Sequence, residues 1–141
     1  MSATLLTACL VIGIADGDTL TARCDNQPPI KVRLAEIDAP EKNQPFGQHS
    51  KQSLSQMCFK TSADILVQTT DRYKRLVARV TCNGVDANAE QVRQGMAWVY
   101  DKYVIDQSLY AAQDEARQAH RGLWVDVSPM PPWEWRRSQR R

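Results

Sequence analysis

The chain has 141 residues, a length that suits one compact domain with its own hydrophobic core. Hydrophobic residues make up 43% and charged residues 24%, which are ordinary globular values. The formal net charge of +2 is too small to prove a nucleic-acid partner. No apolar run approaches the ~20 residues of a membrane span, so we expect no membrane contact. A monomer is the default expectation.

The chain begins with a predicted meander of three strands. Residues 8–15 are apolar and rich in β-branched side chains, residues 18–23 resume an alternating pattern, and the Asp-Gly pair between them is a strong turn signal. After a second turn at residues 25–29, the third strand starts at Ile30. Adjacent strands of a meander lie only about 5 Å apart, so side chains at their ends can meet.

A charged loop ends this third strand. Arg33 projects to the face opposite the apolar residues of the strand. Pro40 cannot continue a strand ladder and steers its predecessor away from helix, so Asp38 and Glu41 lie on a loop at the strand's end. One cation and two carboxylates are therefore expected at one sheet edge, although solvated loop charges are the simpler alternative.

The middle of the chain is predicted to alternate helix, strands and helix. A helix is expected over residues 47–60, and two further strands over residues 63–70 and 75–82. Asn88 is expected to cap the next helix, with Gln91 at the capping-box position.

A last helix is expected over residues 108–120, followed by a tail, residues 128–141, rich in Pro, Trp and Arg. The prolines prevent a helix at the start of the tail, and Trp133 and Trp135 either pack back on the domain or mark an exposed contact. Four arginines close the chain as a solvated run that could attract a polyanion: Arg136, Arg137, Arg140 and Arg141.

This order of elements resembles an OB-fold. We predict an α+β, mainly β domain over residues 1–127, a five-stranded OB-fold Greek-key barrel with three helices, followed by the C-terminal tail. Closure into a barrel would remove the free edges that so few strands otherwise expose.

The four cysteines are widely spaced and include no C-x-x-C pair, which argues against a zinc site or a redox motif. Because Cys9 and Cys24 can face each other across the first hairpin, two disulfides, Cys9 with Cys24 and Cys58 with Cys82, are favoured over four isolated thiols. Such bridges would imply an exported protein, secreted or periplasmic, whose signal segment is missing from this sequence.

Charged residues at the strand ends indicate phosphate chemistry. Asp18 lies one strand away from Asp38 and Glu41, and three crowded carboxylates favour a hard, oxygen-ligated cation such as Ca²⁺. Arg33 and Arg75 enter from two strands, and a guanidinium fork matches two phosphate oxygens. A hydrated hairpin turn and surface salt bridges are the alternatives.

Four motifs follow one another along the chain: residues 16–19 (Asp-Gly-Asp-Thr), 33–41 (Arg-Leu-Ala-Glu-Ile-Asp-Ala-Pro-Glu), 71–75 (Asp-Arg-Tyr-Lys-Arg) and 88–95 (Asn-Ala-Glu-Gln-Val-Arg-Gln-Gly). In this order they resemble the thermonuclease, or staphylococcal nuclease-like, family, and the resemblance runs from about Val11 to Trp124. It implies an OB-fold hydrolase, a Ca²⁺-dependent sugar-non-specific nuclease that cleaves DNA and RNA and leaves 3′-phosphate ends.

The resemblance also implies a role for each matching residue. Asp18 and Asp38 would hold Ca²⁺ through their carboxylates, and Ala39 through its backbone carbonyl. Glu41 would act on the attacking water as general base, or orient it. The two arginines of the motifs would neutralise charge on the phosphoryl oxygens, and Arg75 would also favour the leaving oxygen.

Two departures from the family pattern bear on the site. Ala39 stands where some members have threonine, a change that a backbone ligand tolerates. Lys74 stands where glycine is usual, and it needs an awkward backbone conformation if the turn before Arg75 is unchanged. Three tyrosines are candidates for stacking on a base or holding a terminal phosphate: Tyr73, Tyr100 and Tyr103.

Two other functions are weighed against a nuclease. A non-catalytic OB-fold module would bind single-stranded nucleic acid with a basic groove and aromatic side chains, but it has no need of the five charged residues together. A Ca²⁺-bound interaction domain would use Trp133 and Trp135 as a partner contact, and calcium would then change stability without hydrolysis. We therefore expect the nuclease.

Overall fold

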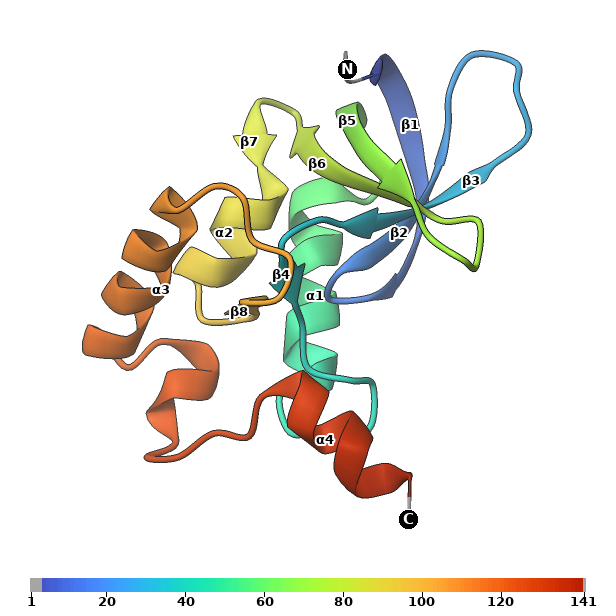
Figure 1. Ribbon diagram of the computed structural model, residues 1–141. Coiled ribbons are helices and arrows are strands. Elements are labelled where there is room, and N and C mark those ends of the chain that lie inside the picture. The colour runs from blue at the N-terminus through green and yellow to red at the C-terminus, as the bar shows by residue number, and fades with distance from the viewer. Residues whose placement is uncertain (1–3, 141) are drawn as a thin grey trace.

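A closed barrel of five strands organises the chain in the computed structural model, which describes residues 4–140 (Figure 1). The strands are β1 (Thr4–Asp16), β2 (Thr19–Arg23), β3 (Ile30–Leu34), β5 (Ser62–Thr70) and β6 (Leu76–Cys82). They pair in the order β3-β2-β1-β5-β6, and parallel pairing of β3 with β6 closes the sheet on itself. The predicted five-stranded OB-type barrel is confirmed, and its closure leaves the barrel strands paired on both sides.

Strand β1 is long because it serves two neighbours. Val11 pairs with Ala22 of β2, and Leu5 pairs with Leu66 of β5, both antiparallel. Shifts of register interrupt both ladders, and such bulges bend a strand enough to curl it around a barrel. The barrel interior is filled by alternate, fully buried apolar side chains, which include Leu20, Val32, Leu34, Ile65 and Val80.

Helices and short strand pairs lie on one side of the barrel (Figure 1). The helices are α1 (Gly47–Cys58), α2 (Ala87–Arg93), α3 (Ser108–Gln118), the 3₁₀ turn η1 (Gly122–Val125) and α4 (Pro132–Gln139). The short strands are β4 (Ile37–Asp38), which pairs with β8 (Trp98–Val99), and β7 (Val85–Asp86), which pairs with β6.

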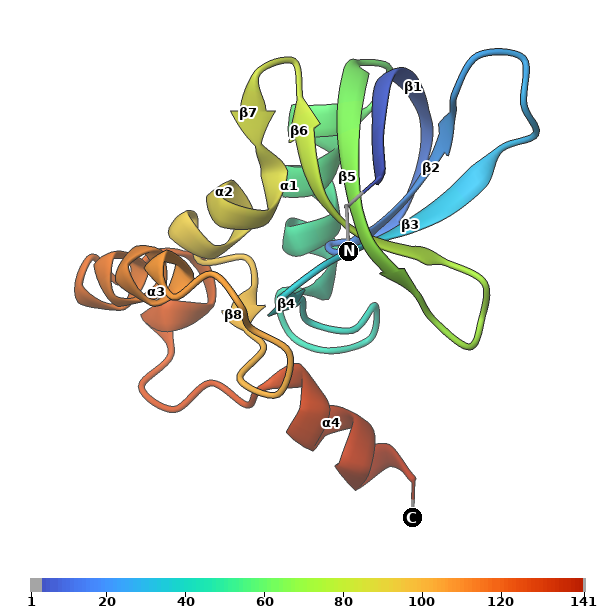
Figure 2. The same ribbon diagram turned by 45° about the horizontal axis from the view of Figure 1, so that its top comes forward.

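The described chain has four α-helices where three are predicted, because the tail also forms one. Pro132 opens α4 at the first helical position, where the missing N–H costs no hydrogen bond. Figure 2 shows α4 beyond β4, apart from α1 and α2, which pack beside the barrel, and from α3, which packs on α2. No helix within residues 4–140 is long and apolar enough to cross a membrane.

The predicted cap of α2 is wrong. Asp86, not Asn88, is the N-cap residue, and its side chain accepts a backbone N–H of the first turn. Asn88 is fully buried: its Oδ1 accepts the Val80 N–H at 2.9 Å, and its Nδ2 donates to the carbonyls of Ala35 at 2.9 Å and Ala78 at 3.1 Å. This amide extends the pairing of β3 with β6 by one step.

Both predicted disulfides are present. Cys9 of β1 is bonded to Cys24, directly after β2, and Cys58 at the end of α1 is bonded to Cys82 at the end of β6. The first bridge closes the hairpin, and the second attaches α1 to the barrel wall.

Candidate active site

The candidate site lies where β3 passes into β4. The Arg33 guanidinium sits between two carboxylates, with Nη1 3.3 Å from Asp18 Oδ2 and Nη2 3.3 Å from Asp38 Oδ1. It also donates to the backbone carbonyls of Leu34, at 2.7 Å, and Ile37, at 3.0 Å. Two charged partners and two carbonyls hold this side chain in one orientation, and only 15% of it is exposed.

The turn between β1 and β2 presents Asp18 to this loop. Asp18 Oδ2 accepts the Ala39 N–H at 2.8 Å, and its Oδ1 accepts the Thr19 hydroxyl at 3.1 Å. From α2, Gln91 Nε2 donates to the Gly17 carbonyl at 2.7 Å. Gln91 therefore stabilises the β1–β2 turn through this hydrogen bond, rather than closing a capping box as predicted.

Crowding changes the pKa of the carboxyl groups. Burial, together with the charge of Asp18, raises the pKa of Asp16 to about 7. Burial raises the pKa of Asp38 to about 6, against the hydrogen bond from Arg136. Burial also disfavours charge on Asp18, yet Arg33 and several hydrogen bonds hold its pKa below the ordinary value. Asp16 thus belongs to the cluster, although the sequence analysis assigned it no role.

Glu36 connects the site to the loop that follows β8. Its backbone has φ 72°, which ends the strand, and its carbonyl accepts the Tyr100 N–H at 2.9 Å. Its side chain is 4% exposed, and Oε1 accepts the N–H groups of Ile105 and Asp106, each at 2.6 Å. Glu36 is therefore a structural carboxylate that positions the loop of Tyr100 beside β4.

Glu41 is held by a residue that the sequence analysis placed in a solvated tail. Arg136 of α4 lies with Nη1 2.6 Å from Glu41 Oε1 and with Nη2 2.7 Å from Asp38 Oδ2. The basic run at the end of the chain was its only signal, and nothing local indicated contact with the loop. Arg141, the last member of that run, lies outside the described residues.

The loop of Glu41 is also held by the Gln44 side chain and by close packing of Gly47. Gln44 Oε1 accepts the Glu41 N–H at 3.0 Å, and Gln44 Nε2 donates to the Met130 carbonyl at 2.6 Å. Gly47 packs so closely under the Glu41 carbonyl that a Cβ there would clash with it. Both the loop and the tail are thus anchored at Gln44.

Arg75 stands apart from the carboxylates. In the described part of the chain its guanidinium pairs with Asp71, Nε to Oδ2 2.8 Å. Val77 is the register partner of Arg33, so Arg75, two residues earlier, faces the same side of the sheet. Lys74 has φ 66°, the left-handed conformation expected of a lysine that replaces glycine in an unchanged turn. The ion pair with Asp71 therefore fixes the orientation of the Arg75 guanidinium.

Two of the three tyrosines lie beside α4. Tyr100 stacks on Trp133 with ring centroids 5.4 Å apart and an angle of 7°, and Tyr103 meets Tyr100 edge-on at 5.0 Å. Tyr73 lies on the turn before β6 and is 64% exposed. Of the two alternatives for the tail tryptophans, Trp133 packs back on the domain.

Comparison with known proteins identifies the family. The profile of the family described as staphylococcal nuclease homologue matches residues 31–126, which include the candidate loop and β6. The chain belongs to this family. An uncharacterized endonuclease of Haemophilus influenzae is 45% identical over 132 residues, covering 94% of this chain and 74% of the relative. A micrococcal nuclease of Shigella flexneri is 36% identical over 141 residues, covering 92% of this chain and 80% of the relative.

The donor atoms of this staphylococcal nuclease homologue suit a hard divalent cation, since all are oxygens. Within residues 4–140, however, no three His, Cys, Asp or Glu side chains are grouped closely enough to hold a metal ion. Arg33 stands between Asp18 and Asp38, and Arg136 between Asp38 and Glu41. Arg136 is itself a cation held by two carboxylates, so the site already accommodates positive charge.

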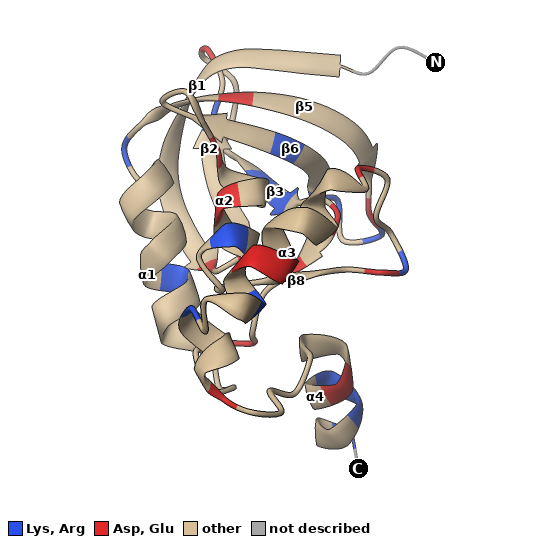
Figure 3. Cartoon of the chain, turned by 90° about the vertical axis from the view of Figure 1, so that its left-hand side faces the viewer, with Lys and Arg blue, Asp and Glu red and all other residues tan. Residues whose placement is uncertain are grey.

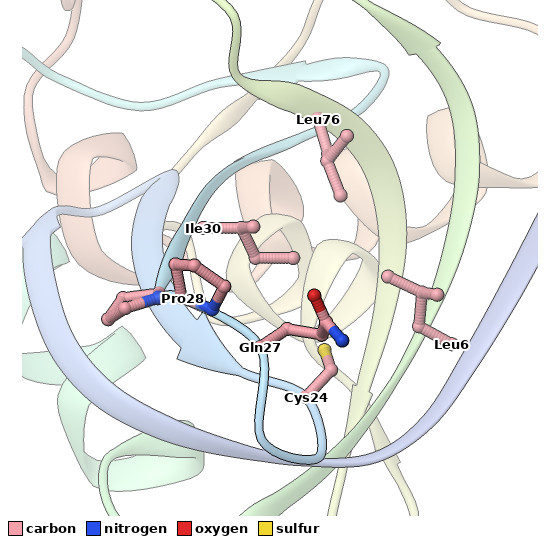
Figure 4. Close-up of a pocket in the computed structure, with 7 residues that line it drawn as sticks. Leu6, Cys24, Gln27, Pro28, Ile30 and Leu76 are labelled. Carbon is pink, nitrogen blue, oxygen red and sulfur yellow. The ribbon is translucent and has the colours of Figure 1, made fainter.

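A hollow in this staphylococcal nuclease homologue lies at the start of β3, away from the carboxylates (Figure 4). Its volume is about 360 Å³, and its lining includes Leu6, Cys24, Gln27, Pro28, Ile30 and Leu76. None of these side chains titrates near neutral pH, because Cys24 is in a disulfide. The hollow therefore offers no acid–base chemistry.

Proposed function

We propose that this protein is a Ca²⁺-dependent nuclease that hydrolyses phosphodiester bonds of both DNA and RNA and leaves 3′-phosphate ends. Its family and its relatives make it a nuclease, and so a phosphodiesterase with nucleic-acid substrates. The metal, the range of substrates and the products are our additions.

One observation carries the proposal: a largely covered arginine, Arg33, is held between two carboxylates beside a third. Arg33 is 15% exposed and touches Asp18 and Asp38, while Glu41 is reached through the shared partner Arg136. A phosphodiester is negative and hindered, so its hydrolysis needs a positioned nucleophile and fixed positive charge at the phosphoryl oxygens. We propose that Glu41, after β4, positions the nucleophile and that Arg33, on β3, supplies the positive charge.

The residues then take distinct roles. Glu41, with 35% of its side chain exposed, is accessible to water and accepts a proton from it, or orients it. Arg33 and Arg75 face one side of the sheet and neutralise the phosphoryl oxygens, and Arg75 assists the 5′ oxygen as it leaves. Asp18, Asp38 and the Ala39 carbonyl would hold Ca²⁺, which adds positive charge at the phosphate when bound.

Recognition through phosphate explains why the sugar is not selected. Arginine forks read phosphate oxygens, which DNA and RNA share, and no base edge is needed for this contact. Stacking of bases on exposed tyrosines such as Tyr73 and Tyr103 is tolerant of sequence, because every base has a π-face. We therefore propose the three tyrosines as substrate contacts.

We also propose that the protein works as a monomer outside the cytoplasm. Its two disulfides support this location, because such bonds persist mainly in oxidising compartments, secreted or periplasmic.

The test is release of acid-soluble nucleotides from heat-denatured DNA and from RNA, with excess Ca²⁺ or excess chelator. We expect release that requires Ca²⁺ and that falls by about 10²-fold or more in Glu41→Gln, the scale of losing one preorganised group at a transition state. Glu115→Gln, a change on the exposed side of α3, is the matched control and should retain full activity.

Each failure has a separate meaning. Full activity in chelator would remove Ca²⁺ from the proposal, and full activity of Glu41→Gln would remove Glu41 from the site. No release by the folded parent protein would favour a module that only binds single-stranded nucleic acid.

A further inference from the structure

The proposed reaction leaves the contact of α4 with the site unexplained. Arg136 makes two short bonds, to Asp38 Oδ2 at 2.7 Å and to Glu41 Oε1 at 2.6 Å, and its Nη2 lies 3.4 Å from the Tyr100 hydroxyl. Charge-assisted bonds of this kind are among the strongest that side chains form. The hydrogen bond with Asp38 raises the pKa of Arg136, so it remains a cation at every physiological pH.

The two partners of Arg136 are the groups that the reaction needs free. Asp38 is proposed to bind metal, and a guanidinium 2.7 Å from its Oδ2 would repel a metal ion bound to the same carboxylate. Glu41 is proposed to act on the attacking water, and the Arg136 guanidinium covers its Oε1 at 2.6 Å. In this conformation Arg136 therefore occupies the working atoms of the site.

Helix α4 is attached in a way that permits release. Pro132 is its one buried residue. Besides Arg136, two half-buried tryptophans hold the helix: Trp133 stacks on Tyr100 and meets Trp98 edge-on, and Trp135 lines a hollow beside Gln44. A helix of eight residues is too short to be stable by itself, so its structure depends on these contacts. The match to the family ends at residue 126, before this helix begins. Figure 3 shows α4, with basic and acidic residues along it, standing clear of α1.

We infer that α4 is a latch opened by the metal ion: Arg136 closes the site in the absence of metal, and Ca²⁺ bound at Asp38 displaces the guanidinium and frees the helix. The inference rests on the proposed function, because it takes Asp38 as a ligand of Ca²⁺. The guanidinium and the metal ion compete for the Asp38 carboxylate, so each weakens the binding of the other.

The first test follows the helix itself by amide hydrogen exchange of residues 132–139 in the full chain, with and without saturating Ca²⁺. In the parent protein, Ca²⁺ should accelerate exchange in this segment. In Arg136→Ala, exchange should already be fast without Ca²⁺ and should not change when it is added. Arg137→Ala removes the same charge from the neighbouring position, which faces another side of the helix, and it should behave like the parent.

The second test measures the affinity for Ca²⁺ by titration calorimetry. If the latch is closed nine times in ten, its removal tightens apparent binding about tenfold, because the measured constant is divided by the open fraction. We expect about this gain for Arg136→Ala and less than about twofold for Arg137→Ala. Arg136→Ala could also tighten Ca²⁺ binding only by removing the repulsion between the guanidinium and the metal ion. In that case α4 would stay protected from exchange, so the exchange data distinguish this from release of the helix.

The outcomes that overturn the latch are distinct from those that overturn the nuclease. Unchanged protection of α4 at saturating Ca²⁺, or equal affinity of the parent and Arg136→Ala, would refute the latch while leaving the proposed function intact. Absence of Ca²⁺ binding by both proteins would refute the latch together with the calcium dependence. Nucleotide release by the parent protein remains the separate test of the activity.

Discussion

Replacement of Asn88, on α2, by alanine should destabilise the barrel more than most single changes. The Asn88 amide is fully buried and makes three hydrogen bonds, to the Val80 N–H and to the carbonyls of Ala35 and Ala78. Alanine cannot replace any of them. The segment after β3, which leads to the candidate site, would lose its connection to β6.

The magnitude follows from what is left unpaired. The Ala78 carbonyl keeps a bond from the Ala35 N–H at 2.8 Å, so the groups that lose Asn88 without a substitute are the Val80 N–H and the Ala35 carbonyl. Each buried orphan costs about 1–3 kcal/mol, and a small cavity adds to this. We expect Asn88→Ala to lower the free energy of unfolding by about 3–5 kcal/mol, a large part of the ~5–15 kcal/mol available to a domain.

Urea unfolding of the oxidised protein, followed by far-ultraviolet circular dichroism, measures this free energy. Asp86→Ala is the control: it removes the cap of the same helix and a partly exposed ion pair with Arg79, and it should cost about 1–2 kcal/mol. If Asn88→Ala lost no more than Asp86→Ala, the amide would not be joining the strands, and our account of this part of the barrel would be wrong.

Two further predictions concern stability. The double variant Cys58→Ser, Cys82→Ser removes a bridge between residues 24 apart. By the chain-entropy relation it should lower the free energy of unfolding by about 3.5 kcal/mol. A decrease below about 1 kcal/mol in urea unfolding would contradict this prediction. Glu36→Gln should make the free energy of unfolding less sensitive to acid. Burial raises the pKa of Glu36, but the hydrogen bonds that it accepts from backbone N–H groups hold this pKa below the ordinary 4.5. Its stabilisation is thus complete above about pH 4.5 and is lost as pH falls through the lower folded pKa. Unfolding measured from pH 7 to pH 3 should therefore decline less steeply in the variant, and parallel curves would refute the assignment.

Local signals account for what the sequence could predict. The Asp-Gly turn defines the first hairpin, and hairpin geometry brings Cys9 opposite Cys24, so both followed from short stretches. The meeting of Arg33, Asp18 and Asp38 was predictable too, because neighbouring strands of a meander place their ends together.

Partners far apart in the chain account for what was missed. Asn88 and Gln91 fit a capping box by spacing, but buried hydrogen bonds to other strands decided their roles instead. The arrival of Arg136 at Asp38, 98 residues away, leaves no local trace, since a basic run looks the same whether it is solvated or paired. Asp16 was seen only as a turn residue, because the burial that raises its pKa comes from the assembled cluster.

The parallel pairing of β3 with β6 also bears on how fast the protein folds. The strand that carries Arg33 finds its second neighbour only after α1 and β5 have been synthesised and placed, so the closing contact joins distant parts of the chain. Chains with such high contact order fold slowly, in about milliseconds to seconds, because loop-closure entropy is lost before the contact forms. A nascent chain that ends before Leu76 therefore already contains Asp18, Arg33, Asp38 and Glu41 but lacks the strand that closes the barrel around them.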